Sequence, residues 1–447
     1  MLENLISLII IFAYSIKCMD IKLSLGSKLN ENNAYPVIIT LREPLISQIN
    51  NIDLFCVYDT SGSMIGNRTF YLKKALNLII DTLNTNDRLS LIPFSTYSKT
   101  ELVLTEMNKS NKRTAKEIVN SIRIGGGTNF NAAIDEFFKG IQNYTKLNDG
   151  RIKSIIFFTD GEPTSAEKNS TRYLYNLLKT TNQKYDFTIN TIGIGSYIAS
   201  YLLMDFSDKR DGAFYSVNET NYYMMEYYVL NIIGAMRTTS FNFVNMKIES
   251  NYEIVKIFGN NHLSNYSLID SKIINNEVLQ FISGKEYTYV IEVKLPDKIE
   301  RGEKILNFNV VYTDVFGKIY QASNSLEFGP SIINPNLYRE EYCRVWALES
   351  IENSIKFSQS LKEVVSEIKT ECGNDINKNI SLILDEILLL YDKPIRYYNN
   401  FIYGVIYEGI LKRNGINLWY SNEYQYKLIN DYIYALIYEL LINSKNN

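Results

Sequence analysis

The stretch that decides the fold is Leu54-Phe-Cys-Val-Tyr-Asp59-Thr-Ser61-Gly-Ser63-Met-Ile-Gly66. Its first five residues form an apolar run typical of a buried strand, and a carboxylate and two hydroxyls follow where that strand should end. Oxygen ligands of this kind suit Mg²⁺ or Mn²⁺. The stretch therefore predicts a cation site made by Asp59, Ser61 and Ser63 at the end of a central strand.

Two distant segments repeat this arrangement. Gly125-Gly-Gly-Thr128-Asn129 precedes a helical pattern, and Ile155-Ile-Phe-Phe-Thr159-Asp160-Gly161-Glu162 is another apolar run that ends in oxygen ligands. Each segment alone could be a helix cap or a turn. Together they indicate one site, to which Thr128 and Asp160 would contribute. The glycine run lacks the lysine of a phosphate-binding loop, which argues against nucleotide binding.

In this order the three segments resemble the von Willebrand factor type A domain and its metal-ion-dependent adhesion site. The resemblance implies that Ser61 and Ser63 bind the metal directly, that Asp59 often acts through water, and that Thr128 and Asp160 belong to the same site. It also implies an incomplete coordination sphere, which a Glu or Asp carboxylate of a partner protein fills. The prediction is therefore a non-enzymatic, metal-dependent protein-binding module with an adhesion or scaffold role.

Residues 51–237 alternate buried strands with amphipathic helices. The apolar runs are Ile52–Tyr58, Arg88–Phe94, Ile152–Phe158 and Phe187–Ile194, and Asp211–Tyr215 resembles the family's edge strand. Apolar residues recur at helical spacing after the first and second loops: Leu72, Leu76, Ile79 and Leu83, then Phe130, Ala133, Ile134, Phe137, Phe138 and Ile141. This pattern predicts an α/β fold with a doubly wound, mostly parallel sheet, in which ligands bind outside the carboxyl ends of the strands.

The segments on both sides have the two-residue period of β-strands. Within 238–330, one face is formed by Leu306, Phe308, Val310 and Tyr312, and another by Tyr287, Tyr289, Ile291 and Val293. Before the α/β domain, Met19–Leu25 and Val37–Arg42 also read as strands. We therefore expect the α/β domain to be inserted in a β-sandwich built from residues 19–50 and 238–330.

The remainder of the chain is expected to be helical. Residues 331–394 predict a small bundle with two apolar stripes: Tyr342, Val345, Leu348, Ile351 and Ile355, then Ile380, Ile383, Ile387 and Leu390. Residues 395–447 form a tyrosine-rich tail. Packing against the rest of the protein is the favoured interpretation of this tail, and an adhesive surface is the alternative.

Composition excludes several classes of function. The 447 residues include 46 basic and 49 acidic side chains, so no basic footprint for a nucleic acid is indicated. His262 is the single histidine, which excludes multi-histidine zinc sites and leaves one residue on which a Ser-His-Asp triad could be built. The four cysteines form no Cys-x-x-Cys pair and indicate neither a zinc ribbon nor a dense disulfide framework: Cys18, Cys56, Cys343 and Cys372.

Some functional alternatives stay open. The architecture is similar to eukaryotic intracellular type A proteins, some of which carry a ubiquitin-ligase module; this chain lacks the zinc ligands of a RING, but could be the substrate-binding partner of such a ligase. A metal-assisted hydrolase is least favoured, because Glu162 is the one additional acid beside the third loop. An extracellular adhesion protein would use the same metal site.

The first 18 residues are ambiguous. Leu5–Tyr14 is apolar but too short to span a bilayer, so no transmembrane segment is expected. The run has the length of a signal-peptide core, yet Glu3 precedes it and no basic residue does. We therefore expect a cytoplasmic protein, with secretion through residues 1–18 as the alternative.

Overall fold

The computed structural model describes most of the chain between Met19 and Gly329 and a smaller part of the C-terminal region. The described residues are 19–28, 33–42, 49–144, 149–161, 163, 170–180, 186–195, 198–217, 222, 224–258, 267–269, 271–283, 286–329, 339, 342–343, 346–347, 350, 360–373 and 384. The leader 1–18, the tail 395–447, Glu162 and His262 lie outside them. Among the described residues, no helix is long and apolar enough to cross a membrane.

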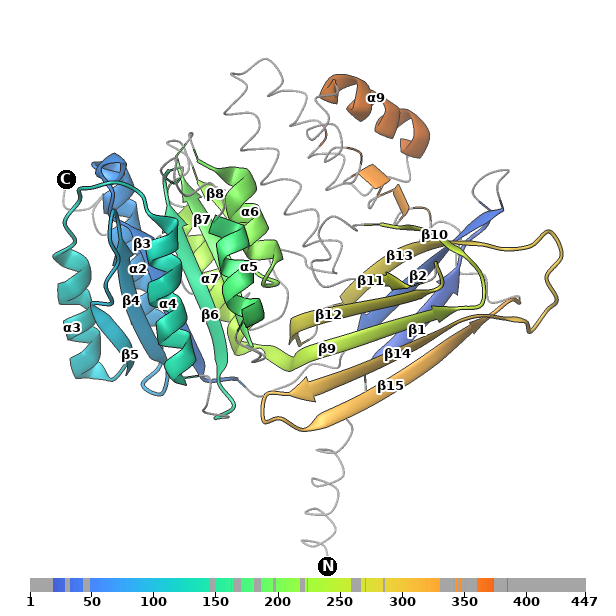
Figure 1. The fold of residues 1–447 in the computed structure, drawn as a ribbon, viewed down its shortest axis with the longest axis horizontal. Helices are drawn as coiled ribbons and strands as arrows, with labels where there is room; N and C mark the ends of the chain where they lie inside the picture. Colours follow the sequence, from blue (N-terminus) through green and yellow to red (C-terminus); the bar gives the residue numbers. More distant parts are fainter. Residues whose placement is uncertain are drawn as a thin grey trace, which may run out of the picture.

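A mostly parallel sheet forms the centre of residues 51–237 (Figure 1). Its strands are β3 (Ile52–Asp59), β4 (Arg88–Phe94), β5 (Leu102–Glu106), β6 (Ile152–Thr159), β7 (Phe187–Ile194) and β8 (Phe214–Val217). They lie in the order β5-β4-β3-β6-β7-β8, in which β5 runs antiparallel to β4 and the other neighbours run parallel. Every residue of β3, β6 and β7 is buried, as expected for strands covered on both faces.

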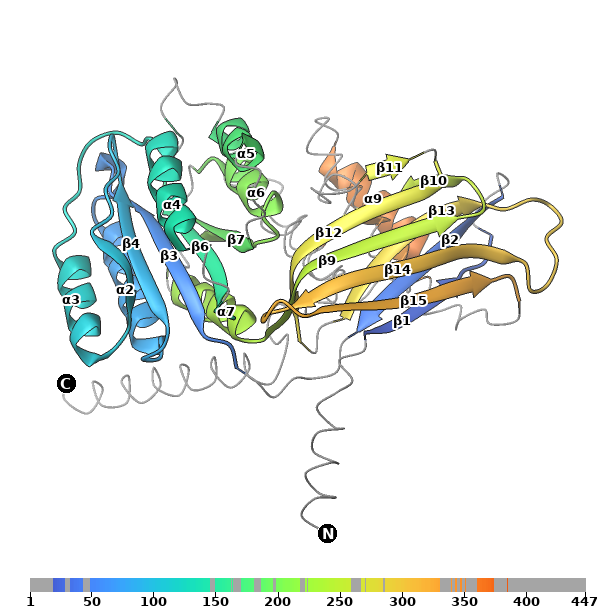
Figure 2. The same ribbon diagram turned by 60° about the horizontal axis from the view of Figure 1, so that its bottom comes forward.

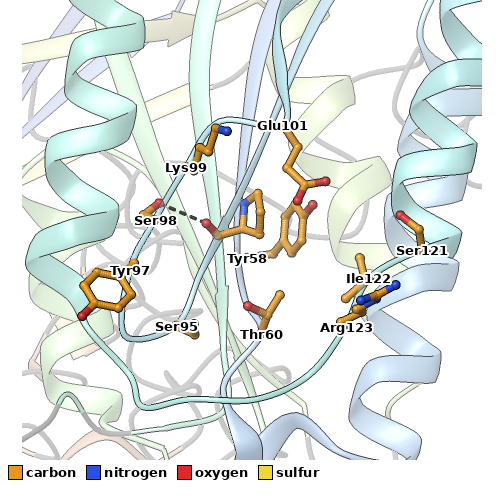
Figure 3. Close-up of a pocket in the computed structure, with 11 residues that line it drawn as sticks. Tyr58, Thr60, Ser95, Tyr97, Ser98, Lys99, Glu101, Ser121, Ile122 and Arg123 are labelled. Carbon is orange, nitrogen blue, oxygen red and sulfur yellow. Dashed lines mark hydrogen bonds between the residues drawn. The ribbon is translucent and has the colours of Figure 1, made fainter.

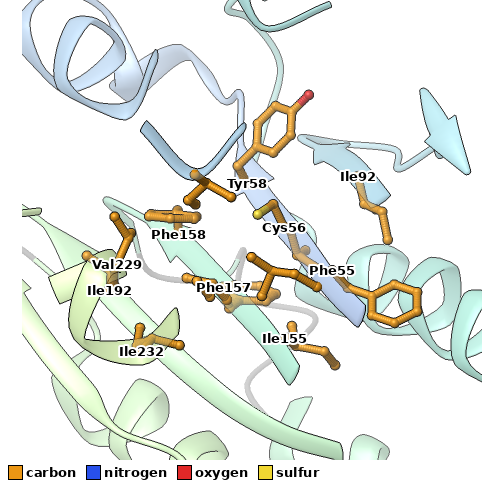
Figure 4. Packing of buried hydrophobic residues seen from close by; sticks show 14 of the residues in the cluster. Phe55, Cys56, Tyr58, Ile92, Ile155, Phe157, Phe158, Ile192, Val229 and Ile232 are labelled. Atoms are coloured by element: carbon orange, nitrogen blue, oxygen red, sulfur yellow. The ribbon is translucent and has the colours of Figure 1, made fainter. Parts of the chain in front are cut away.

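Helices cover both faces of this sheet (Figures 1 and 2). They are α2 (Asn67–Thr82), α3 (Lys109–Asn120), α4 (Phe130–Tyr144), α5 (Ser170–Thr180), α6 (Ser200–Asp208) and α7 (Met224–Arg237). Helix α2 packs against α3 and α7, whereas α4 packs against α5, which in turn contacts α6. Figure 4 shows Val229 and Ile232 of α7 meeting the side chains of the central strands. The predicted doubly wound, mostly parallel α/β sheet is confirmed.

The edge strand begins later than the sequence pattern predicts. Strand β8 is at the sheet edge, as expected, but it spans Phe214–Val217 rather than Asp211–Tyr215. Asp211 has a φ of 48°, which an extended strand cannot accommodate. A Cβ at Gly212 would lie 1.7 Å from the Ile189 carbonyl oxygen, so this glycine allows the chain to cross closely over β7. Residues 211–213 are therefore the approach to the strand.

Two antiparallel sheets form the additional β-structure. The first has the order β1-β2-β13-β10, and the second has the order β11-β12-β9-β14-β15. The bounds are β1 (Asp20–Leu25), β2 (Ala34–Arg42), β9 (Thr239–Ser250), β10 (Ile254–Ile257), β11 (Ser267–Ile269), β12 (Ile273–Ile282), β13 (Glu286–Lys294), β14 (Lys304–Asp314) and β15 (Ile319–Glu327). Because β2 pairs with β13 along its whole length, strands from before and after the α/β domain share one sheet and one core.

The two ends of the α/β domain lie together. The Asn50 amide donates to the Arg237 carbonyl at 2.9 Å, so the chain leaves the domain beside the point where it enters. The sandwich contacts the amino-terminal ends of the sheet strands, since the Gln280 amide nitrogen donates to the Lys153 carbonyl at 3.0 Å. The carboxyl ends of these strands therefore face away from the sandwich.

The outer face of β13 is more buried than strict alternation predicts. Tyr287, Ile291 and Val293 face the sandwich core, but Val290 is also buried. Val290 packs in a second cluster with Ile38 and Phe258, onto which Tyr342 and Trp346 fold. Tyr342 and Trp346 therefore cover this face. A disulfide from the adjacent Cys343 to Cys372 joins this part of the chain to α9 (Leu361–Cys372). All residues of the predicted stripe from Ile380 to Leu390 lie outside the described part of the chain.

The insertion leads to a prediction about fragments. Residues 51–237 should fold alone, whereas 238–330 should aggregate, because β13 would lose β2 and expose an unpaired edge. A matched control joins 19–42 to 238–330 through a short Gly-Ser linker in place of the α/β domain, and this chain should be monomeric. Size-exclusion chromatography and thermal unfolding are the measurements. A soluble fragment 238–330 that unfolds cooperatively would contradict the expected insertion.

Candidate functional site

The first strand-end loop folds around Asp59. Strand β3 ends at this residue, and a short 3₁₀ turn, η1 (Gly62–Met64), follows. The Asp59 side chain is fully buried, and its Oδ1 accepts a hydrogen bond from the Ser61 amide at 2.7 Å. Gly66 then adopts a φ of 88°, which a residue with a side chain rarely takes, and α2 begins at the next residue. The loop therefore places its hydroxyls directly above a buried carboxylate.

The hydroxyls connect this loop to the end of β6. Ser61 Oγ and Ser63 Oγ lie 3.0 Å apart, and Ser63 Oγ donates to Asp160 Oδ1 at 2.8 Å. Thr159 Oγ1 donates to Asp59 Oδ2 at 2.6 Å, so both Asp59 oxygens have protein donors. The ends of the neighbouring strands β3 and β6, about 100 residues apart in sequence, are thereby also joined by side chains.

The glycine loop completes the cluster. Its backbone is fixed to the first loop by hydrogen bonds from Gly125 N to Thr60 O at 2.8 Å and from Gly62 N to Gly126 O at 3.1 Å. Thr128 is buried, and its Oγ1 would lie 3.6 Å from a Cβ placed on Gly161, beside Asp160. The structure therefore brings together all of the predicted site residues: Asp59, Ser61, Ser63, Thr128 and Asp160.

The electrostatics of the site are those of two buried acids. Burial raises the pKa of Asp59 to about 6; hydrogen bonds from Thr159 and Ser61 oppose this shift, and the nearby Asp160 carboxylate adds to it. Asp160 is buried as well. Two carboxylates held close together in a buried site attract a positive charge.

Arg68 is a site residue that the sequence analysis missed. Its guanidinium forms an ion pair with Asp160 Oδ2, and its Nη1 also donates to the Ser63 carbonyl at 3.1 Å. The group packs over Gly195, where a Cβ would lie 3.1 Å from Nη2. Its position in the first turn of α2, directly after the loop, is the signal that could have identified it. The pair shows that Asp160 accepts a cation from the side facing α2.

The donor set fits a hard divalent cation. Hydroxyl and carboxylate oxygens are the ligands that Mg²⁺ and Mn²⁺ take, and no nitrogen or sulfur ligand is required. Within the described ranges, no group of three or more His, Cys, Asp and Glu side chains could hold a metal. The candidate ligands here are instead three hydroxyls and two carboxylates. Ser61, Ser63 and Thr128 would be these ligands, with Asp59 and Asp160 supplying the negative charge.

Comparison with known proteins identifies the α/β domain. A family model described as the von Willebrand factor type A domain matches residues 53–226. The chain contains a type A domain. A bovine inter-alpha-trypsin inhibitor heavy chain H4 is 27% identical over 236 residues, which cover 50% of this chain and 25% of the relative. The ubiquitin-protein ligase WAV3 of Arabidopsis thaliana is 32% identical over 117 residues, covering 26% of this chain and 16% of that protein.

The sheets outside the type A domain also have a counterpart of known structure. A von Willebrand factor type A protein from Catenulispora acidiphila superimposes with a TM-score of 0.65 and 14% sequence identity, covering 87% of this chain and 96% of that chain. At this identity the likeness establishes the fold. Since the coverage far exceeds the type A domain, it includes the flanking antiparallel sheets.

Proposed function

We propose that the type A domain binds a partner protein through Mg²⁺ or Mn²⁺ held by Asp59, Ser61, Ser63, Thr128 and Asp160. A Glu or Asp carboxylate of the partner would complete the coordination. The observation that carries the proposal is the convergence of three hydroxyls on two buried carboxylates. This cluster lies at the carboxyl ends of the strands, where open α/β sheets bind ligands and where the sandwich does not reach.

The role of each side chain follows from its contacts. A bound cation supplies the local positive charge that holds an acidic ligand. Asp59 is fixed by the Ser61 amide and the Thr159 hydroxyl, so it can balance the cation's charge without reorientation. Asp160 shares its two oxygens between Ser63 and Arg68, and Arg68 remains beside the site to neutralise a second carboxylate.

The relatives favour a binding role over a shared reaction. One is named as an inhibitor heavy chain and the other as a ubiquitin ligase, and each matches part of this chain, which itself contains the type A domain. A module that recurs in proteins with such different names is better suited to protein recognition, in adhesion or as a scaffold, than to one chemical step. We therefore propose a non-enzymatic function.

For location, we propose the secreted alternative over the cytoplasmic one. Cys343 and Cys372 form a disulfide, and disulfides persist in oxidising compartments, whereas cytosolic thiols are kept reduced. Mass spectrometry of the alkylated, unreduced protein from its own cells would decide between the two. Alkylation of both cysteines would indicate a reducing compartment and restore the cytoplasmic prediction.

Replacing Thr128 by alanine should weaken partner binding more than metal binding. The cation can be held by Ser61, Ser63 and waters, whereas the state that binds an acidic ligand needs the third hydroxyl. A contact to a charged group is worth about 1.5–3 kcal/mol, so partner affinity should fall about 10–100-fold. Calorimetry measures Mg²⁺ binding, and capture with Mg²⁺ or with EDTA measures partner binding.

The matched control is Thr105→Ala on β5, where the hydroxyl donates to the Val103 carbonyl at 2.6 Å. This change should leave both affinities as they are. A captured partner that survives both EDTA and Thr128→Ala would show that recognition occurs elsewhere on the protein.

A further inference from the structure

A pocket of about 420 Å³ opens next to the candidate metal site (Figure 3). It lies between the end of β3, the loop from β4 to β5 and the end of α3, and none of the five candidate metal-binding residues lines it. Two of its lining residues are nevertheless tied to the metal site. Thr60 lies between Asp59 and Ser61, and the Ser95 carbonyl accepts from Asn129 N at 2.8 Å, directly after Thr128. The pocket and the metal site therefore share a wall.

The floor of the pocket is the hydroxyl of Tyr58. This side chain is fully buried, and among the described residues its Oη has no hydrogen-bond partner. A phenol hydroxyl is neutral at pH 7 and can both donate and accept a hydrogen bond. Figure 3 shows the ring directed toward the Glu101 side chain. Buried polar groups in native proteins are nearly always paired, so an unpaired hydroxyl facing a pocket indicates a ligand.

Three further hydroxyls of the pocket, those of Thr60, Ser98 and Ser121, offer acceptors. Thr60 Oγ1 donates to the Phe94 carbonyl at 2.9 Å, and Ser98 Oγ donates to the Pro93 carbonyl at 3.0 Å. Ser121 Oγ donates to the Ile118 carbonyl at 2.8 Å. Since each of these three hydroxyls has one hydrogen and has used it, only their lone pairs remain for a ligand. Together with the Glu101 carboxylate, they favour a ligand that brings N–H donors.

The charges at the rim limit the ligand further. Lys99 and Arg123 line the pocket along with Glu101. A cationic ligand would meet these two positive groups, and an anionic ligand would meet Glu101 and the acceptor-only hydroxyls. A neutral carboxamide satisfies both sets, because its NH₂ can donate to the floor while its carbonyl accepts from the rim.

We propose that this pocket is a second subsite of the type A domain and that it takes the carboxamide of an Asn or Gln side chain. The pocket lies next to the metal loop. Its use by the same partner rests on the proposed function, in which the partner would carry the amide near its metal-binding Glu or Asp. The carboxamide itself is recognised by Tyr58 and Glu101 without the metal.

The direct test titrates the full-length protein in EDTA with propanamide, and in parallel with propanoate and propylammonium. The reporter is the ¹³C-methyl resonance of Ile122, which lines the pocket and is assigned by Ile122→Val. Propanamide alone should shift this resonance in a saturable manner, and Tyr58→Phe should weaken its binding about tenfold. Equal shifts with the charged probes, or no shift with propanamide, would overturn the proposal.

A matched substitution separates binding from folding. Tyr58→Phe should raise the melting temperature, because it removes a buried hydroxyl that has no partner in the described structure. Tyr312→Phe should instead lower the melting temperature and leave propanamide binding unchanged. Tyr312 Oη is buried in the sandwich, far from the pocket in sequence, and accepts a hydrogen bond from Met19 N at 3.2 Å. A lower melting temperature for Tyr58→Phe would mean that its hydroxyl is already paired, and the pocket would lose its floor.

A second experiment tests the link to the metal. Peptides with a fixed aspartate and randomised neighbours are displayed and selected on the wild-type protein with Mg²⁺. Selected peptides should be enriched in Asn or Gln near the aspartate, and Tyr58→Phe should remove that preference. Mg²⁺-dependent peptides without an amide preference would refute the subsite and leave the metal-dependent function intact. Peptides that bind equally in EDTA would refute the metal-dependent function, and the propanamide titration would still decide the pocket.

Discussion

Replacing Asp87 by alanine should lower the free energy of unfolding by about 3–5 kcal/mol, since it leaves a buried charge without its partner. Both Nη atoms of Arg237 donate to the Asp87 carboxylate, and both side chains are almost completely buried. The same carboxylate accepts from Ile52 N at 3.1 Å, so it also fixes the start of the central strand. The pair connects the last residue of α7 to the loop before β4. Urea denaturation would measure the loss as a lower midpoint, with an unchanged dependence of the free energy of unfolding on urea concentration.

The control for this prediction is a surface pair. Asp81 forms an ion pair with Lys116 at 2.6 Å, but both side chains are exposed. Asp81→Ala should therefore change the stability by about 1 kcal/mol or less. If Asp87→Ala and Asp81→Ala had similar small effects, the buried pair would not be what joins the two ends of the type A domain.

Replacing Asp59 by asparagine should stabilise the metal-free protein at pH 7. The folded-state pKa is raised to about 6 from an ordinary value of 3.8, mainly by burial, so between these values the folded state binds more protons than the unfolded state. The stability of the wild type therefore falls as pH rises through this window, and the penalty is complete above pH 6. At about 1.4 kcal/mol for each pKa unit, the gain from asparagine should be on the order of 1–3 kcal/mol.

The pH dependence provides the internal control. In EDTA, the melting temperature of Asp59→Asn should exceed that of the wild type at pH 7, and the difference should disappear as pH falls below about 4, where the wild-type carboxyl is protonated in both states. A substitution that is less stable than the wild type at pH 7 would show that the Thr159 and Ser61 hydrogen bonds outweigh the cost of burying the charge.

Local sequence was sufficient for the parts of the fold that depend on short-range pattern. The runs that form β3, β4, β6 and β7 are mostly apolar because both faces of these strands are covered. Such a run can be recognised even when its predicted start or end is wrong by one residue. Asp59, Ser61 and Ser63 lie within five residues, so their proximity is fixed by the loop. The fold class could therefore be predicted from strands and motif together.

Features that depend on tertiary packing could not be predicted in this way. Arg68 directly follows the first loop, but its partner Asp160 lies 92 residues away and comes within reach because β3 and β6 are neighbours in the sheet. The Tyr58 hydroxyl, which has no partner among the described residues, and the ion pair between Asp87 and Arg237 are both set by residues distant in sequence. The start of β8 was misplaced because the left-handed backbone at Asp211 is not apparent from the residue type.

Divalent-cation binding by the clustered hydroxyls and carboxylates is the proposal on which the function depends. Isothermal titration of Mg²⁺ into the full-length, EDTA-treated and desalted protein tests it most directly, with Asp59→Asn as the comparison, because this change preserves the shape of the side chain and removes its charge. We expect a single saturable binding event for the wild type that Asp59→Asn abolishes. Identical titration curves for the two proteins, or no saturable heat for either, would contradict it.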